Sequence, residues 1–273
     1  MPRSRLFIWL LKKGFPLRTL FSRFTKVPIL GKAVDSILFH ENDNVIYLPK
    51  DGVTIININQ SIDHGELVVP SKILEHFIEE AQYHWIMDWC ICRSSSSCEH
   101  YPISLGCLFL GEAAMKIDPR LGRKVTKEEA LEHAKKCREA GLVHLIGRDK
   151  IDSFWLKVGP HDKLLTICNC CDCCCLWRIL PFVSSKIASK VTKMPGVNVI
   201  VSNEKCIGCG TCTRVCFVKA IDVIDKKASI SDECRGCGRC VEVCSKNAIE
   251  LTIEGIENFN DVIERVESLV DVT

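Results

Sequence analysis

The feature that most constrains this chain is a repeated pattern of cysteines near its C-terminus. Residues 204–223 and 232–251 align at a shift of 28, and each copy has the spacing C-x2-C-x2-C-x3-C. The cysteines are Cys206, Cys209, Cys212 and Cys216 in the first copy and Cys234, Cys237, Cys240 and Cys244 in the second. Cysteines separated by two residues let a tight loop direct three thiolates at one metal centre, and the intervening glycines allow backbone amides to approach the sulfurs. The repeat predicts two iron–sulfur clusters rather than a pair of zinc knuckles.

This part of the chain resembles the bacterial-type ferredoxins, which carry two [4Fe-4S] clusters, and the resemblance covers residues 201–253. In that family the fourth cysteine of each run ligates the other cluster. The resemblance therefore implies one cluster on Cys206, Cys209, Cys212 and Cys244 and a second on Cys234, Cys237, Cys240 and Cys216. Phe217 and Ser245 stand where the family usually has proline, which alters the local turn and removes no ligand. The implied function is one-electron transfer between redox partners.

The cysteine content and the net charge restrict the cellular compartment and the class of partner that this chain can have. Cysteine accounts for 19 of the 273 residues, an odd number in a chain long enough to build a hydrophobic core, so a disulfide framework is disfavoured. The apolar run Leu6–Leu11 is shorter than a secretory signal requires, and no run approaches a membrane span. A net charge of +2 offers no general field for nucleic acid, and no nucleic-acid partner is expected. We expect reduced thiols that bind metal in the cytoplasm.

Residues 1–34 differ from the rest of the chain. They contain eight basic residues and no acidic residue, interleaved with aromatic and aliphatic side chains. This pattern is typical of helices that lie in a membrane interface with their cations on anionic lipid. Gly14 and Pro16 interrupt the run, which predicts two short helices with a bend. The expectation is peripheral contact with the inner face of the cytoplasmic membrane; the alternatives are an arm packed on the protein body or on a partner subunit, and a removed transit sequence.

Residues 35–200 predict a cysteine-rich front domain of mixed helices and strands, so the whole chain is expected to be α+β. A ferredoxin-like domain with a pseudo-twofold repeat follows at 201–253, and a helical tail follows at 254–273. The expected strands are Asn44–Leu48, Val53–Asn57, Leu142–Ile146, Phe154–Val158 and Leu164–Ile167. The expected helices are 70–86, 126–141, which begins at a capping box of Thr126 and Glu129, and 176–190.

Two groups of cysteines in the front domain predict a further metal centre. The first group is Cys90, Cys92, Cys98 and Cys107, with Cys107 expected at the start of a helix. The second group is Cys168, Cys170, Cys171, Cys173, Cys174 and Cys175. Thiolates in these numbers indicate an additional iron–sulfur cluster or zinc. For the second group a cluster shared with the first group, a redox-active thiol pair and simple packing all stay open.

The whole chain also resembles a family of 4Fe-4S dicluster-domain proteins from anaerobic microbes. The resemblance rests on Cys90–Arg93 with Gly106–Gly111, on Gly122–Leu131 and on the cysteine run Cys168–Cys175. No activity is established for that family, so the resemblance implies an anaerobic setting and little more.

Three functions are compatible with these patterns, and no catalytic residue is assigned. The leading hypothesis is an electron carrier between a redox protein partner and a redox enzyme or membrane complex. The alternative is a reductase whose catalytic iron–sulfur centre in the front domain is fed by the ferredoxin clusters, and a weaker third is a metal-delivery protein. His84 and His100 flank the first cysteine group and are the histidines to examine, whereas Cys137 is expected to be packing.

Overall fold

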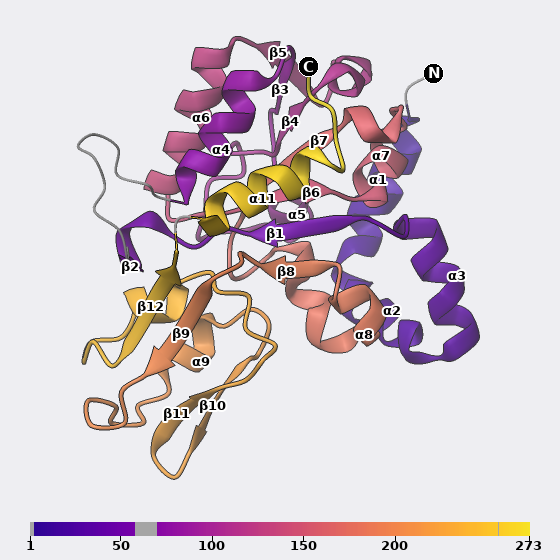
Figure 1. Ribbon diagram of the computed structural model, residues 1–273. Coiled ribbons are helices and arrows are strands. Elements are labelled where there is room, and N and C mark those ends of the chain that lie inside the picture. Colours follow the sequence, from indigo (N-terminus) through magenta and orange to yellow (C-terminus); the bar gives the residue numbers. More distant parts are fainter. Residues whose placement is uncertain (1–2, 58–69, 256) are drawn as a thin grey trace, which may run out of the picture.

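The computed structural model describes residues 3–57, 70–255 and 257–273. It mixes helices and strands, and Figure 1 shows a large sheet with its helices above a smaller unit built mainly from the last quarter of the chain. The large sheet has seven strands in the order β5-β3-β4-β7-β6-β1-β8. Their bounds are β1 Asn44–Tyr47, β3 His84–Met87, β4 Leu108–Leu110, β5 Gly122–Val125, β6 Val143–Arg148, β7 Leu165–Cys170 and β8 Val191–Lys193. All neighbouring strands are antiparallel except β1 and β8.

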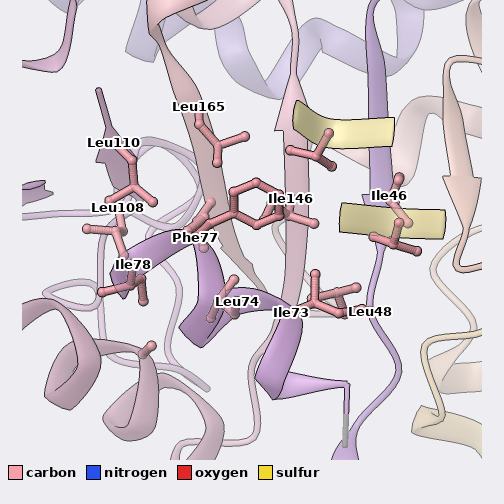
Figure 2. Close-up of a cluster of buried hydrophobic side chains, with 14 of the residues drawn as sticks. Ile46, Leu48, Ile73, Leu74, Phe77, Ile78, Leu108, Leu110, Ile146 and Leu165 are labelled. Carbon is pink, nitrogen blue, oxygen red and sulfur yellow. The ribbon is translucent and has the colours of Figure 1, made fainter. Parts of the chain in front are cut away.

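Three helices cover one face of this sheet: α4 (Ser71–Glu80), α6 (Lys127–Glu139) and α11 (Glu257–Glu267). Their apolar residues follow helical spacing, as in α4, and pack with strand residues into one buried cluster, part of which Figure 2 shows. The α4 members are Ile73, Leu74, Phe77 and Ile78. Because α11 joins the same cluster, the C-terminal tail returns to the front domain and closes its core.

The smaller unit interlocks with the front domain. Strand β9 (Val197–Val201) pairs antiparallel with β12 (Ile249–Glu254), and β2 (Thr54–Asn57) pairs parallel with the other edge of β12. The hairpin of β10 (Ile221–Ile224) and β11 (Lys227–Ile230) and the short helices α9 (Thr211–Val215) and α10 (Arg239–Glu242) complete the unit. A strand from the first quarter of the chain therefore belongs to the sheet of the cysteine repeat.

The N-terminal segment folds into three helices rather than the two expected. They are α1 (Arg5–Gly14), α2 (Arg18–Arg23) and α3 (Pro28–Leu38), joined by the 3-10 turns Phe15–Leu17 and Phe24–Lys26. The first break falls at Gly14 and Pro16, as predicted, and the second falls before Pro28, which begins α3. Phe7, Ile8 and Leu11 pack against the buried cluster around Trp85 and Phe109, so one face of α1 rests on the protein body. Within the described residues no helix is long and apolar enough to cross a bilayer.

Several other expectations are met or corrected. The capping box of Thr126 and Glu129 starts α6, as predicted. The helix from residue 70 ends at Glu80, and Trp85 and Ile86 lie in β3, because pairing with β4 and β5 on both sides overrides the helical periodicity. The strand expected at Phe154–Val158 is wrong, since α7 (Lys150–Leu156) runs through it from an Asp149 cap.

Two further corrections concern segments next to cysteines. Cys107 directly precedes β4 and does not start a helix. Residues 176–190 form the 3-10 segment Leu176–Phe182 and a short α8 (Ser185–Ala188), because Pro181 prevents a continuous α-helix. The remaining elements are α5 (Ile91–Ser95) and the 3-10 turns Asp51–Val53, Glu112–Lys116 and His161–Lys163.

Candidate iron–sulfur and metal centres

The eight cysteines of the repeat line two separate cavities. One cavity is lined by Cys206, Cys209, Cys212 and Cys244, and the other by Cys216, Cys234, Cys237 and Cys240. Each cavity therefore receives three thiols from one copy of the repeat and the fourth from the other copy. This division is the one that the ferredoxin resemblance implies, and four convergent thiols are a suitable donor set for an iron–sulfur cluster.

Glycines shape the loops around these cavities. Gly208 and Gly210 have φ of +67° and +74°, and the equivalent Gly236 and Gly238 have +63° and +82°. Only glycine adopts this left-handed region at little cost. At Gly208 a Cβ would also lie 2.4 Å from the Lys226 carbonyl oxygen, so a larger residue would displace the hairpin that covers the first cavity.

Backbone amides donate hydrogen bonds to the sulfurs in matching positions. The Ala220 amide donates to Cys216 Sγ at 3.2 Å, and the Ala248 amide donates to Cys244 Sγ at 3.3 Å. In both copies the donor lies four residues after the fourth cysteine. Such bonds stabilise negative charge on sulfur and are one of the factors that set the reduction potential of a cluster.

The two cavities differ in their surroundings. The first lies near the surface, where Cys209 is exposed and the neighbouring Ile207 is 58% exposed. The second faces the front domain, and Phe217 and Val218 beside it are buried in one apolar cluster with Tyr47. Burial raises the pKa of Cys237 in this second cavity to about 11, so ionised thiolates there require a compensating positive charge.

The structure groups the ten candidate ligand cysteines of the front domain differently from their order in the chain. Cys98 leaves the first sequence group and converges with Cys171, Cys173 and Cys174, which we call the tetrathiolate site. The other six form the six-thiol group, which comprises Cys90, Cys92, Cys107, Cys168, Cys170 and Cys175. The two sequence groups thus contribute to both sites.

The six-thiol group lies where β7 ends against the loop that precedes α5. Cys107 Sγ is 3.9 Å from Cys168 Sγ, and Cys175 Sγ is 3.0 Å from Cys170 Sγ. Cys168 and Cys170 are two apart on β7 and therefore lie on one face of the sheet. A hydrogen bond from the Cys92 thiol lowers the pKa of Cys90 to about 6, while the hydrogen bond with the Cys168 thiol and burial raise the pKa of Cys107.

Arg93, the residue after the first C-x-C, is fully buried between the two thiol sites. Its Nε donates to the Pro102 carbonyl oxygen at 2.9 Å, its Nη1 donates to the Asn169 carbonyl oxygen at 2.7 Å, and its Nη2 donates to the Leu105 carbonyl oxygen. Nearby thiols, Cys90 foremost, raise the pKa of Arg93 against the effect of burial. No role for this arginine was predicted from the sequence, although its place directly after Cys92 was the available signal.

Arg239 and Tyr47 connect the second cavity to the six-thiol group, and sequence reasoning missed both. Arg239 is 5% exposed, and its Nη2 donates to the Cys170 carbonyl oxygen at 2.5 Å. The Tyr47 hydroxyl lies 3.9 Å from Cys175 Sγ, and its ring centroid is 4.9 Å from that of Phe217. Phe217 follows Cys216, which lines the second cavity, so a continuous line of contacts joins the two sites.

The two candidate histidines have separate positions. His84 is buried in β3, and its Nε2 bonds the Ile78 carbonyl oxygen at 2.7 Å, which is a structural role. His100 is exposed in the loop after Cys98. Cys137 is fully buried on α6, and burial raises its pKa to about 12, as expected for a packing residue.

Comparison with known proteins bears on the C-terminal unit. Residues 198–245 match the family model described as a 4Fe-4S dicluster domain, and all eight cysteines of the repeat lie inside this range. No match was found among curated proteins or among solved structures. The chain therefore contains a 4Fe-4S dicluster domain near its C-terminus, a class of domain that points to iron–sulfur electron transfer.

We predict that Arg93→Met strongly destabilises the protein. The change removes the donor to the Pro102, Leu105 and Asn169 carbonyl groups and the positive charge beside the thiols, so the free energy of unfolding should fall by roughly 3 kcal/mol or more. Anaerobic thermal unfolding measures the effect. Arg265→Met, at an exposed arginine of α11, is the matched control and should change stability by less than about 0.5 kcal/mol. Equal unfolding midpoints for the two variants would contradict the role assigned to Arg93.

Proposed function

We propose that this protein is an iron–sulfur electron carrier whose C-terminal unit holds two [4Fe-4S] clusters within a ferredoxin-like, pseudo-twofold fold. The first cluster is ligated by Cys206, Cys209, Cys212 and Cys244, and the second by Cys234, Cys237, Cys240 and Cys216. The match to the dicluster domain carries the proposal, and the two cavities with their divided thiol sets support the ligand assignment. Each cluster accepts one electron at a time.

The surroundings of the cavities support a direction for the electron path. The first cavity opens beside exposed apolar side chains, Ile207, Val223 and Ile224, which suit brief docking of a redox protein partner. The second cavity adjoins the buried core of the front domain. Electrons exchanged with the partner at the first cluster would therefore reach the second cluster and pass inward.

The ligand assignment predicts the effect of single substitutions on iron content. Two clusters account for about eight iron atoms and eight acid-labile sulfides per chain. Cys206→Ala and Cys240→Ala should each lose about four iron atoms, with a different EPR signal of the reduced protein lost in each case. Cys137→Ala, a buried cysteine outside both cavities, is the control and should lose none. Zinc in place of iron at these sites would refute the electron-carrier proposal.

A second candidate function is a reductase with the six-thiol group as its terminal iron–sulfur centre. The observation that favours it is the line of contacts from Cys216 through Phe217 and Tyr47 to Cys175. A cluster held by only three of these six thiols would have one iron not capped by cysteine, and such an iron can bind a substrate. In this candidate the ferredoxin clusters supply the electrons.

The reductase candidate predicts iron beyond the two ferredoxin clusters. The anaerobically purified chain should contain about twelve iron atoms, and Cys107→Ala and Cys168→Ala should each remove only the additional four. The EPR signal of this further centre should change when a small ligand such as cyanide is added. An iron content of about eight, unaffected by Cys107→Ala, would leave the carrier as the function and eliminate the reductase.

We further propose that the protein works in an anaerobic cytoplasm and contacts the inner membrane surface peripherally through its first three helices. Large apolar side chains on these helices are exposed although other residues of the same helices are packed inward. On the helices they are Leu6, Trp9, Leu10, Leu20, Phe21, Ile29, Leu30 and Ile37, and the exposed Leu17 and Phe24 lie in the 3-10 turns between the helices. The eight basic residues of 1–34, without an acid, complement anionic lipid.

The lipid contact can be tested by flotation with vesicles that contain phosphatidylserine. The full-length protein should float with these vesicles, less at high salt, and a Trp9→Gln, Phe21→Gln, Ile29→Gln variant should stay in the soluble fraction. The matched control carries Ile200→Gln and Ile224→Gln, two similarly exposed residues of the dicluster unit, and should float like the unaltered protein. Equal flotation of all three proteins would refute the proposed lipid contact.

A further inference from the structure

The tetrathiolate site has the spacing of ligands around one metal ion. The sulfurs of Cys98, Cys171, Cys173 and Cys174 all lie within 4.8 Å of one another. Cys98 Sγ is 3.6 Å from Cys173 Sγ, which is 3.5 Å from Cys174 Sγ. A tetrahedral zinc ion with bonds of about 2.3 Å holds its sulfurs about 3.8 Å apart. The four thiols therefore match a mononuclear site without large movement.

The same structure provides an internal comparison with the ferredoxin-domain cysteines. In the part of the chain that the structure describes, the thiols of neither ferredoxin cavity form such a close group. A cubane separates its cysteine ligands by four irons and four sulfides, so its ligands stand farther apart than those of a single ion. The close sulfur spacing at the tetrathiolate site and the wider spacing in the ferredoxin cavities thus indicate two kinds of metal centre.

Local structure directs these four side chains to one point. Cys98 follows α5 after Ser97, whose φ is +49°, and its sulfur accepts hydrogen bonds from the amides of His100 and Tyr101. The other three cysteines lie just after β7, at the turn Asp172–Cys174, where the Cys174 amide donates to Cys171 Sγ at 3.3 Å. A metal ion here would join two loops that are more than seventy residues apart in the chain.

Charge compensation also favours a bound cation. A divalent ion displaces four thiol protons and leaves a complex of charge −2. Arg18 donates to the Cys174 carbonyl oxygen at 3.4 Å, and Arg178 donates to the Asp172 carbonyl oxygen, which places two positive charges beside such a complex.

We propose that the tetrathiolate site binds one zinc ion, which ties the loop after α5 to the turn after β7. Four protein thiolates complete the coordination, and Leu142, Leu105 and Tyr101 pack around them, so the site is closed and structural rather than catalytic. This inference goes beyond the proposed electron transfer, because zinc has no redox role. It also leaves the six-thiol group as the separate set of front-domain cysteines available for redox chemistry.

The test is metal analysis of the full-length protein purified anaerobically from medium that contains both iron and zinc. We expect one zinc per chain, with X-ray absorption at the zinc edge showing four sulfur ligands at about 2.3 Å. Cys98→Ala and Cys173→Ala should lose the zinc and keep the iron and the EPR signals of the ferredoxin clusters. Cys137→Ala, buried in the same cluster but outside the four ligands, should keep both metals.

Three results would overturn the assignment. The first is the absence of zinc from the unaltered protein. The second is the loss of several iron atoms in Cys98→Ala, which would show an iron–sulfur cluster at this site. The third is a disulfide between any two of the four cysteines. The absorption spectrum of the unaltered protein decides the question even if a variant fails to fold. Failure of the electron-carrier proposal would appear separately, as missing iron at the ferredoxin cysteines.

Discussion

Most of this structure depends on how buried sulfur is balanced by buried positive charge. Arg93 and Arg239 are almost inaccessible to solvent, and each uses its guanidinium to bond backbone carbonyls beside thiols. A buried charge is tolerated only where it is paired and hydrogen-bonded. Arg93 holds the loop of residues 98–107 and the end of β7 around the front-domain thiols, and Arg239 holds the second ferredoxin loop against them. These two side chains therefore connect the front-domain thiols to the loops around them and to the dicluster unit.

The dicluster unit is also joined to the front domain through its secondary structure and is not an appended module. Its sheet includes β2 from the front of the chain, and α11 returns from it to close the large core. The second cavity consequently lies against Tyr47 and the six-thiol group, whereas the first stays near the surface. The two cavities thus differ in their access to solvent, and the second adjoins the front-domain thiols. The tetrathiolate site lies where the loop after α5 meets the turn after β7.

Sequence patterns predicted some elements well and others wrongly, for physical reasons. The capping box at Thr126 and Glu129 is local, and it starts α6 as expected. The helical periodicity from residue 70 continued falsely into Trp85 and Ile86, because a strand buried between two others carries apolar residues at successive positions and imitates a helix face. Likewise the composition of Phe154–Val158 is apolar enough for a strand. Asp149, however, caps the start of helix α7, and this helix continues to Leu156.

The sequence by itself determined the chemistry of the C-terminal unit, because spacings of two and three residues between cysteines confine the ligands of each loop regardless of the rest of the fold. It also identified ten of the eleven front-domain cysteines as metal-binding candidates. Only the tertiary structure decided how those ten divide, since Cys98 meets Cys171, Cys173 and Cys174 across a chain separation that no local pattern encodes. The tertiary structure alone also places Arg93, Arg239 and Tyr47 beside the thiols, because burial and contact between distant segments are properties of the folded chain.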